Sequence, residues 1–162
     1  MKAKSSAIRH LRSTKAPWIS ILRAADWPAV RNVLSTYGDV RIFEVEGRNC
    51  QTKSALLSEF AGRLTFPDYF GRNWDAFDEC IQDLEWVAAS GYLVVIANAD
   101  RLLEKDKDNY DVFLDSMRTA AKEWARRQTG ESHGIPFHVI LLVPDGDMVA
   151  SKWKVPPLAS IT

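Results

Sequence analysis

The chain has 162 residues, of which 46% are hydrophobic and 26% are charged, a composition typical of one globular domain with a core of normal size. Its formal net charge is zero and its pI is near 6.8, which argues against a protein that binds polyanions over its whole surface. No stretch approaches the ~20 consecutive apolar residues of a membrane-spanning helix, so we expect a cytoplasmic protein without membrane contact.

The cysteines and histidines are few and scattered. Cys50 and Cys80 lie far apart, and His10, His133 and His138 do not accompany them. Because no group of these residues has the spacing of a zinc site, we expect no metal and no other cofactor. Two isolated thiols are typical of a reducing compartment, although the sequence is also compatible with one disulfide. His138 lies within an apolar stretch and is interpreted as a hydrogen-bonded core residue.

The N-terminal part, residues 1–38, carries seven basic residues and one acid, a net charge of +6. Residues 1–15 are predicted to form a flexible arm. A short helix is predicted to begin at Asp26, with Pro28 in its first turn, and to stop at Gly38. We interpret this part as an extension packed on the main domain. A nucleic-acid-binding arm is the less favoured alternative, because the basic residues are not interleaved with aromatic residues on which bases stack.

From residue 39 onward, strand and helix patterns alternate. Strands are predicted over 39–47, 91–99 and 136–143, and helices over 52–64, 73–84 and 107–128. Continuous apolar strands separated by helices predict an α/β fold with a small parallel three-stranded sheet flanked by helices. We place this domain at residues 39–144. Residues 145–162 are rich in turn-forming residues and are predicted to be a tail that runs over the surface.

The stretch FPDYFGRNWDAFDECIQDLEW, residues 66–86, contains six acids and one base, a net charge of −5. It predicts a helix with Asn73 as its N-cap and with Asp75, Asp78 and Glu79 pointing away from the core. Asp75 in the first turn is favoured by the helix dipole. Glu79 lies one turn later, where the two like charges repel each other by ~0.2–0.5 kcal/mol. The buried stripe of this helix consists of Phe77, Cys80, Ile81 and Leu84.

Three interpretations of the acids are open: a solvated helix face, a catalytic pair, or a surface for a cationic partner. A catalytic pair is disfavoured because both acids lie on the same side of any substrate and no histidine accompanies them. The chain also has no glycine-rich phosphate loop and no nucleophile elbow. The loop before the helix contains Pro67, Tyr69 and Gly71, and Trp74 follows. Aromatic residues beside clustered carboxylates favour a recognition surface for a cationic protein site.

The run FPDYFGRNWDAFDECIQDL resembles the signature of the barstar family, the intracellular inhibitors of barnase-like ribonucleases. The resemblance covers about residues 40–143 and implies the family's fold, which agrees with the three-stranded sheet derived above. The residues that carry it form one ungapped run: Pro67, Tyr69, Gly71, Asn73, Asp75, Ala76 and Cys80.

The resemblance implies that the loop and the helix plug the active site of a ribonuclease. Glu79 stands where the family has its dominant aspartate, and Asp78 stands where the type inhibitor has a tryptophan. A glutamate that the family carries on its late helix aligns near Thr119, so that contact is lost. The implied partner-binding residues are Tyr69, Gly71, Asn73, Trp74, Asp75, Asp78 and Glu79.

The function implied is that of an inhibitor or immunity protein for a barnase-like ribonuclease or a related toxin nuclease. Such a protein is not an enzyme, makes no direct contact with nucleic acid and is expected to be a monomer when free. The altered acids at Asp78 and Glu79 keep a second hypothesis open, in which the same fold binds another basic protein or a different toxin nuclease.

Overall fold

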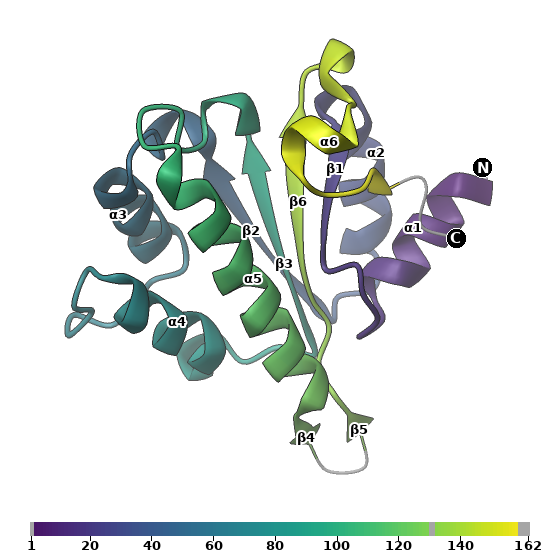
Figure 1. The fold of residues 1–162 in the computed structure, drawn as a ribbon. Coiled ribbons are helices and arrows are strands. Elements are labelled where there is room, and N and C mark those ends of the chain that lie inside the picture. The colour runs from purple at the N-terminus through teal and green to yellow at the C-terminus, as the bar shows by residue number, and fades with distance from the viewer. Residues whose placement is uncertain (1, 130–131, 159–162) are drawn as a thin grey trace.

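The computed structural model describes residues 2–129 and 132–158 and is built around one parallel sheet (Figure 1). The expected parallel sheet flanked by helices is confirmed, but the sheet has four strands in the order β1-β6-β3-β2 rather than three. Its strands are β1 (Ile19–Arg23), β2 (Val40–Glu46), β3 (Gly91–Ala97) and β6 (Phe137–Val143).

The additional strand, β1, comes from the N-terminal part of the chain. It pairs in parallel with β6, in a register that runs from Ile19 opposite Val139 to Arg23 opposite Val143. The side chain of Ile21 has no exposed surface. The sequence did not predict this strand because its apolar run is short, is interrupted by Ser20 and ends at the exposed Arg23.

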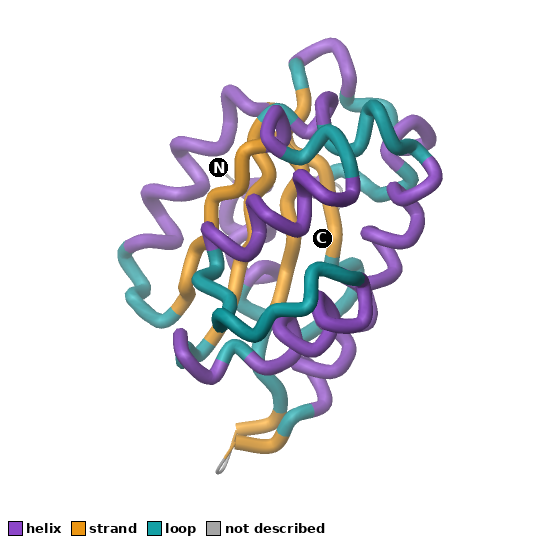
Figure 2. The backbone as a smooth tube through the Cα atoms, turned by 90° about the vertical axis from the view of Figure 1, so that its left-hand side faces the viewer, coloured by secondary structure: helices purple, strands orange, loops and turns teal. Residues whose placement is uncertain are grey.

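Helices cover both faces of the sheet (Figure 2). β6 shows the two cores directly, since Val139 and Leu141 pack on one face and Ile140 and Leu142 on the other. On the first face lie α3 (Lys53–Arg63), α4 (Trp74–Asp83), α5 (Asp108–Arg126) and α6 (Ala150–Trp153). On the second face lie α1 (Lys2–Leu11) and α2 (Trp27–Ser35).

Short elements complete the chain. A two-stranded hairpin extends from the end of α5 and consists of β4 (Gln128–Thr129) and β5 (Ser132–His133). Single 3-10 turns follow several elements: η1 (Ala24–Asp26), η2 (Gly47–Asn49), η3 (Glu85–Val87), η4 (Ala99–Arg101) and η5 (Asp145–Asp147). Within the described ranges, no helix has both the length and the apolar character needed to cross a membrane.

The predicted flexible arm at residues 1–15 is wrong, because most of it forms α1. Ile8 and Leu11 of this helix are buried in the second core. The ring centroid of His10 lies 4.9 Å from that of His138. The His138 Nε2 lies 2.7 Å from the Ser13 carbonyl oxygen, and the His10 Nε2 lies 2.8 Å from the Pro17 carbonyl oxygen. His138 is 1% exposed, which confirms that it is a hydrogen-bonded core residue. The N-terminal segment therefore builds one layer of the fold.

The composition of the C-terminal residues predicts a tail on the surface, but part of this segment is packed into the core. Trp153, Val155 and Leu158 are all buried. The Tyr110 hydroxyl donates a hydrogen bond of 2.7 Å to the Trp153 carbonyl, which attaches this segment to α5. Three isolated apolar side chains among turn-forming residues have no periodic pattern, so the sequence offered no signal of this packing.

Candidate partner-binding surface

The loop between α3 and α4 is fixed to the core by aromatic rings. Phe66 is buried, and its ring centroid lies 5.0 Å from that of Phe70 and 6.1 Å from that of Phe77. The Phe70 N–H donates to the Pro67 carbonyl at 3.0 Å and closes a turn. Tyr69, inside this turn, is 76% exposed. The loop therefore projects Tyr69 into solvent from a rigid base.

The start of α4 is capped as the sequence predicts. The Asn73 Oδ1 accepts a hydrogen bond of 2.8 Å from the Ala76 N–H, and its Nδ2 donates to the Gly71 carbonyl at 3.2 Å. A Cβ atom on Gly71 would lie 3.3 Å from the same Nδ2, a close contact to which the Asn73 side chain would have to adjust. Arg72 has a left-handed φ of 49° and donates to the Ser58 hydroxyl at 2.6 Å. These contacts hold the loop and the helix in one orientation.

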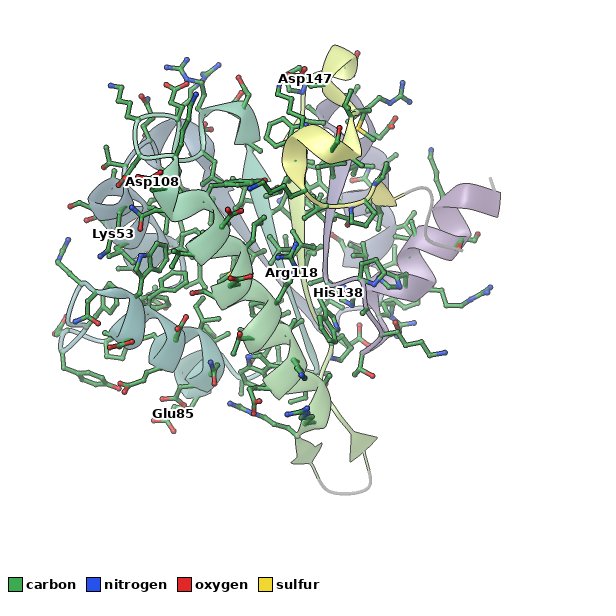
Figure 3. All side chains as sticks on the ribbon, in the orientation of Figure 1. Lys53, Glu85, Asp108, Arg118, His138 and Asp147 are labelled. Atoms are coloured by element: carbon green, nitrogen blue, oxygen red, sulfur yellow. The ribbon has the colours of Figure 1, made fainter. Side chains whose placement is uncertain are left out.

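Trp74 is half-buried and is fixed by a chain of hydrogen bonds that the sequence did not reveal. Its Nε1 donates to the Asn109 Oδ1 at 3.0 Å, and the Asn109 Nδ2 donates to the Asp106 Oδ1 at 2.8 Å. Asp106 also accepts from the backbone N–H of Lys53 at 3.0 Å. These two hydrogen bonds, from Lys53 and then from Asn109, lower the pKa of Asp106. Figure 3 labels Lys53, whose ammonium lies 5.9 Å from the Trp74 ring centroid.

The buried stripe of α4 is as expected, and Asp75 and Glu79 are exposed on the opposite face. Neither carboxylate makes an ion pair or a hydrogen bond with any described residue. More generally, every ion pair among the described residues lies outside residues 66–86. The net charge of −5 in this segment is therefore not neutralised by the protein itself.

Asp78 does not lie on the outward face that the helical wheel predicts. It is half-buried on the side of α4 that packs against α5, and its Oδ1 is buried without a hydrogen-bond partner in the described part of the chain. Burial raises the pKa of Asp78, a hydrogen bond with Ser116 lowers it, and the charge of Asp75 raises it further. The wheel failed here because it treats only the core stripe as buried and ignores the neighbouring helix.

Negative charge also extends from α4 toward the loop. Partial desolvation, followed by the charges of Asp83, Glu85 and Glu79, raises the pKa of the Tyr69 hydroxyl. The hydroxyl thus stays protonated and can donate a hydrogen bond at neutral pH. In Figure 3, Glu85 lies just beyond the end of α4. Thr119, near which the family glutamate aligns, is exposed on α5 and adds no charge.

The two cysteines are unreactive thiols. Cys50 and Cys80 are free and buried, and burial, with the charges of Glu59 and Glu46, raises the pKa of Cys50 to about 12. A thiol that remains protonated is a poor nucleophile. No group of His, Cys, Asp and Glu among the described residues could hold a metal ion, and the side chain of His133 lies outside those residues.

Most of the chain matches one known protein family. Residues 40–141, from the start of β2 to within β6, match the profile of the family described as Barstar (barnase inhibitor). No curated protein sequence matches the chain.

Among solved structures, the fold is similar to that of the Aeropyrum pernix ORC2 protein, determined as ADPNP-ADP complexes. The TM-score is 0.51 at 14% sequence identity, over 89% of this chain and 40% of that chain. At this identity the likeness concerns the fold alone. The present chain spans less than half the length of that protein, and its sequence contains no glycine-rich phosphate loop.

Proposed function

This chain belongs to the barstar family, and we propose that it inhibits a barnase-like ribonuclease by covering the active site with its acidic loop and α4. One observation carries the proposal. Asp75 and Glu79 are exposed one helical turn apart, and no described residue forms an ion pair with either. The two unpaired carboxylates repel each other and so lower the stability of the free protein. Binding of a cationic partner relieves this repulsion.

The chemistry of the target explains why carboxylates serve this purpose. A ribonuclease holds the phosphates of RNA with Lys, Arg and His side chains, so its active site is a cationic cleft. Asp75 and Glu79 present oxygens that take the place of phosphate oxygens and accept charge-assisted hydrogen bonds. The surrounding acids add a long-range negative field that attracts a basic partner and is screened by salt.

The residues around the two carboxylates supply shape and rigidity. Asn73 and Gly71 fix the start of α4, and Trp74 is held through Asn109. Because these groups are ordered before binding, little side-chain entropy is lost when the complex forms. The exposed Tyr69 contributes contact area at the edge of the interface. Of the seven residues implied by the family resemblance, Asp75 and Glu79 thus make the charged contacts. The other five support them, and among these Asp78 lies against α5.

In this role the protein is an immunity protein that acts inside the producing cell before the ribonuclease is exported. It catalyses no reaction and requires no cofactor. It binds the ribonuclease rather than RNA, and it is a monomer until it meets its target.

The direct test is titration of barnase with the purified full-length protein while cleavage of a fluorogenic RNA is monitored. We expect stoichiometric inhibition that weakens as salt is raised. Asp75→Asn and Glu79→Gln should each weaken inhibition at least tenfold, about 1.4 kcal/mol, with little change in thermal stability. Asp145→Asn is the matched control, because Asp145 is also exposed and unpaired among the described residues but lies beyond β6.

Two results would contradict the proposal. The first is that the wild-type protein inhibits neither barnase nor other toxin nucleases at low salt. The second is that the Asp75 and Glu79 variants inhibit as well as the Asp145 control does. If these variants instead unfold the protein, the carboxylates have a structural role.

Binding to a different basic protein is the second candidate function. It is favoured by Asp78, a half-buried carboxylate that stands where the type inhibitor has a tryptophan, and by Glu79, whose side chain is longer than that of the family's aspartate. Affinity capture from the source cell distinguishes the two. Repeated recovery of one non-nuclease protein, lost on Glu79→Gln, would favour this second function.

A further inference from the structure

A cavity of about 600 Å³ lies beyond the carboxyl ends of β3 and β6. One wall is residues 99–107, which follow β3, and the other is α6 with Lys154 after it. Figure 1 shows α6 and the start of α5 at this same end of the sheet. Open α/β sheets bind their ligands outside the carboxyl ends of the strands, and the volume is that of a small-molecule site.

The floor of the cavity is apolar and fixed in position. Leu102, Leu103 and Trp153 line it and are each buried. The Trp153 Nε1 donates a hydrogen bond of 2.7 Å to the Asp147 carbonyl, and the Trp153 carbonyl accepts one from Tyr110. A buried indole that is held at both its ring and its backbone offers a rigid surface for the apolar part of a ligand.

Four lysines line the rim of the cavity, and two of them are free of ion pairs with described residues. Lys152 is paired with Asp147 at 2.9 Å, and Lys154 is paired with Asp111 at 2.7 Å. Lys105 and Lys107 are exposed, and no described residue forms an ion pair with either.

Two acids also line the cavity, but they do not cancel this charge. Glu104 already pairs with Arg101 at 2.8 Å, which leaves Asp100 as the unpaired acid of the lining among the described residues. Because Lys152 and Lys154 are neutralised by Asp147 and Asp111, the unpaired charges of the lining are Lys105 and Lys107 against Asp100, an excess of one positive charge.

The backbone of both walls adopts an unfavourable conformation that other contacts maintain. Leu103 and Lys154 have left-handed φ values of 54° and 59°, each costing on the order of 1–3 kcal/mol for a residue with a side chain. The Leu103 N–H donates to the Cys50 carbonyl at 2.7 Å, and Arg118 donates to the Lys154 carbonyl at 3.2 Å. Each wall is thus attached to a neighbouring part of the fold, and the cavity is present in the protein without a ligand.

We propose that this cavity binds a small phosphate ester, with its phosphate group against Lys105 and Lys107 and its apolar body on the floor formed by Leu102 and Trp153. Lysines are point-charge donors suited to phosphate oxygens.

Asp106, between the two lysines, is linked through Asn109 to Trp74 of the acidic segment, but Asp75 and Glu79 do not line the cavity. In Figure 3, Glu85, at the end of that segment, lies far from Asp147 near α6. The proposal therefore goes beyond ribonuclease inhibition and does not depend on it.

The test is isothermal titration of the full chain, at low salt, with ADP, inorganic pyrophosphate and adenosine in turn. ADP carries both phosphate and an aromatic body, pyrophosphate carries only the charge, and adenosine carries only the body. We expect ADP to bind with a Kd below about 1 mM, pyrophosphate more weakly, and adenosine not measurably. The variant Lys105→Ala/Lys107→Ala should weaken ADP binding at least tenfold.

The matched control is Lys4→Ala/Lys122→Ala, which removes the same charge from two exposed lysines outside the cavity. Both variants are expected to melt at the wild-type temperature. The proposal is overturned if neither ADP nor pyrophosphate binds the wild-type chain, if adenosine binds as tightly as ADP, or if the two double variants bind ADP equally. No ribonuclease is present, so these outcomes are independent of the inhibition assay.

Discussion

The N-terminal layer, residues 2–35, and the acidic segment, residues 66–86, carry charge of opposite sign that the protein uses in different ways. In and beside the layer, three arginines form ion pairs within the molecule. Arg12 pairs with Asp39 at 2.9 Å, Arg23 with Asp26 at 2.9 Å and Arg31 with Glu44 at 3.4 Å. None of the six acids of the segment has such a partner among the described residues.

This difference separates a structural region from a surface that is available for binding. Arg12 also lies 3.7 Å from the centroid of the Tyr37 ring, so its charge and its planar face are already engaged within the molecule. Within the predicted arm, residues 1–15, Arg12 is thus engaged, whereas Lys4, Arg9 and Lys15 form no ion pair with a described residue. Excess charge in a sequence can thus be paired within the protein or left free for a partner, and only the pairing observed in the fold distinguishes the two.

The largest effect is expected from removing the N-terminal layer. Deletion of residues 1–38 takes away β1 and exposes Ile140 and Leu142 of β6, which α1 and α2 otherwise cover. We expect the remaining chain to lose cooperative thermal unfolding, measured by circular dichroism. The variant Lys4→Ala/Arg9→Ala, which changes only exposed charges of α1, should unfold as the wild type does. A truncated chain that melts cooperatively near the wild-type temperature would show that the layer is dispensable.

A smaller effect, confined to acidic pH, is expected from His138 of β6, which contacts Ser13 and His10 of the N-terminal layer. Burial lowers the pKa of His138 from 6.5 to about 4, so between these values the unfolded chain binds a proton that the folded chain does not. The free energy of unfolding should therefore fall as pH is lowered from 6.5 toward 4, by about 3 kcal/mol in total.

Urea unfolding at a series of pH values measures this loss. The variant His138→Gln keeps a donor for the Ser13 carbonyl but cannot titrate, so its stability should depend less on pH over this range. Equal pH dependence of the variant and the wild type would mean that His138 does not carry the effect.

The smallest effects on stability are expected from single substitutions in the two charged regions, and they have opposite signs. Glu79→Gln removes repulsion with Asp75 and Asp83, each one helical turn away, and should raise stability by about 0.2–0.5 kcal/mol. Arg31→Gln breaks the exposed pair with Glu44 and should lower stability by about 0.2–1 kcal/mol. Chemical denaturation of both variants in one buffer checks the signs. A loss of stability in both would mean that the acidic segment is also stabilised by its charge.

Several parts of the site follow from the sequence alone. The Asn73 cap, the buried stripe of α4 and the outward position of Asp75 and Glu79 depend on residues within three or four positions of one another, so helical periodicity is sufficient to predict them. The three strands that follow residue 39 were also predicted from local patterns. β2 alternates apolar and charged residues, and β3 and β6, which are buried on both faces, are continuous apolar runs. The family resemblance also rests on one ungapped local run.

The tertiary structure decided everything that depends on a distant partner. Trp74 is fixed by Asn109, 35 residues later in the chain, and Arg12 is neutralised by Asp39, 27 residues later. The fourth strand and the buried side of Asp78 likewise depend on β6 and α5 as neighbours. Local periodicity specifies which face of an element is apolar, but only the packed fold specifies which charges meet a partner and which remain free for another molecule.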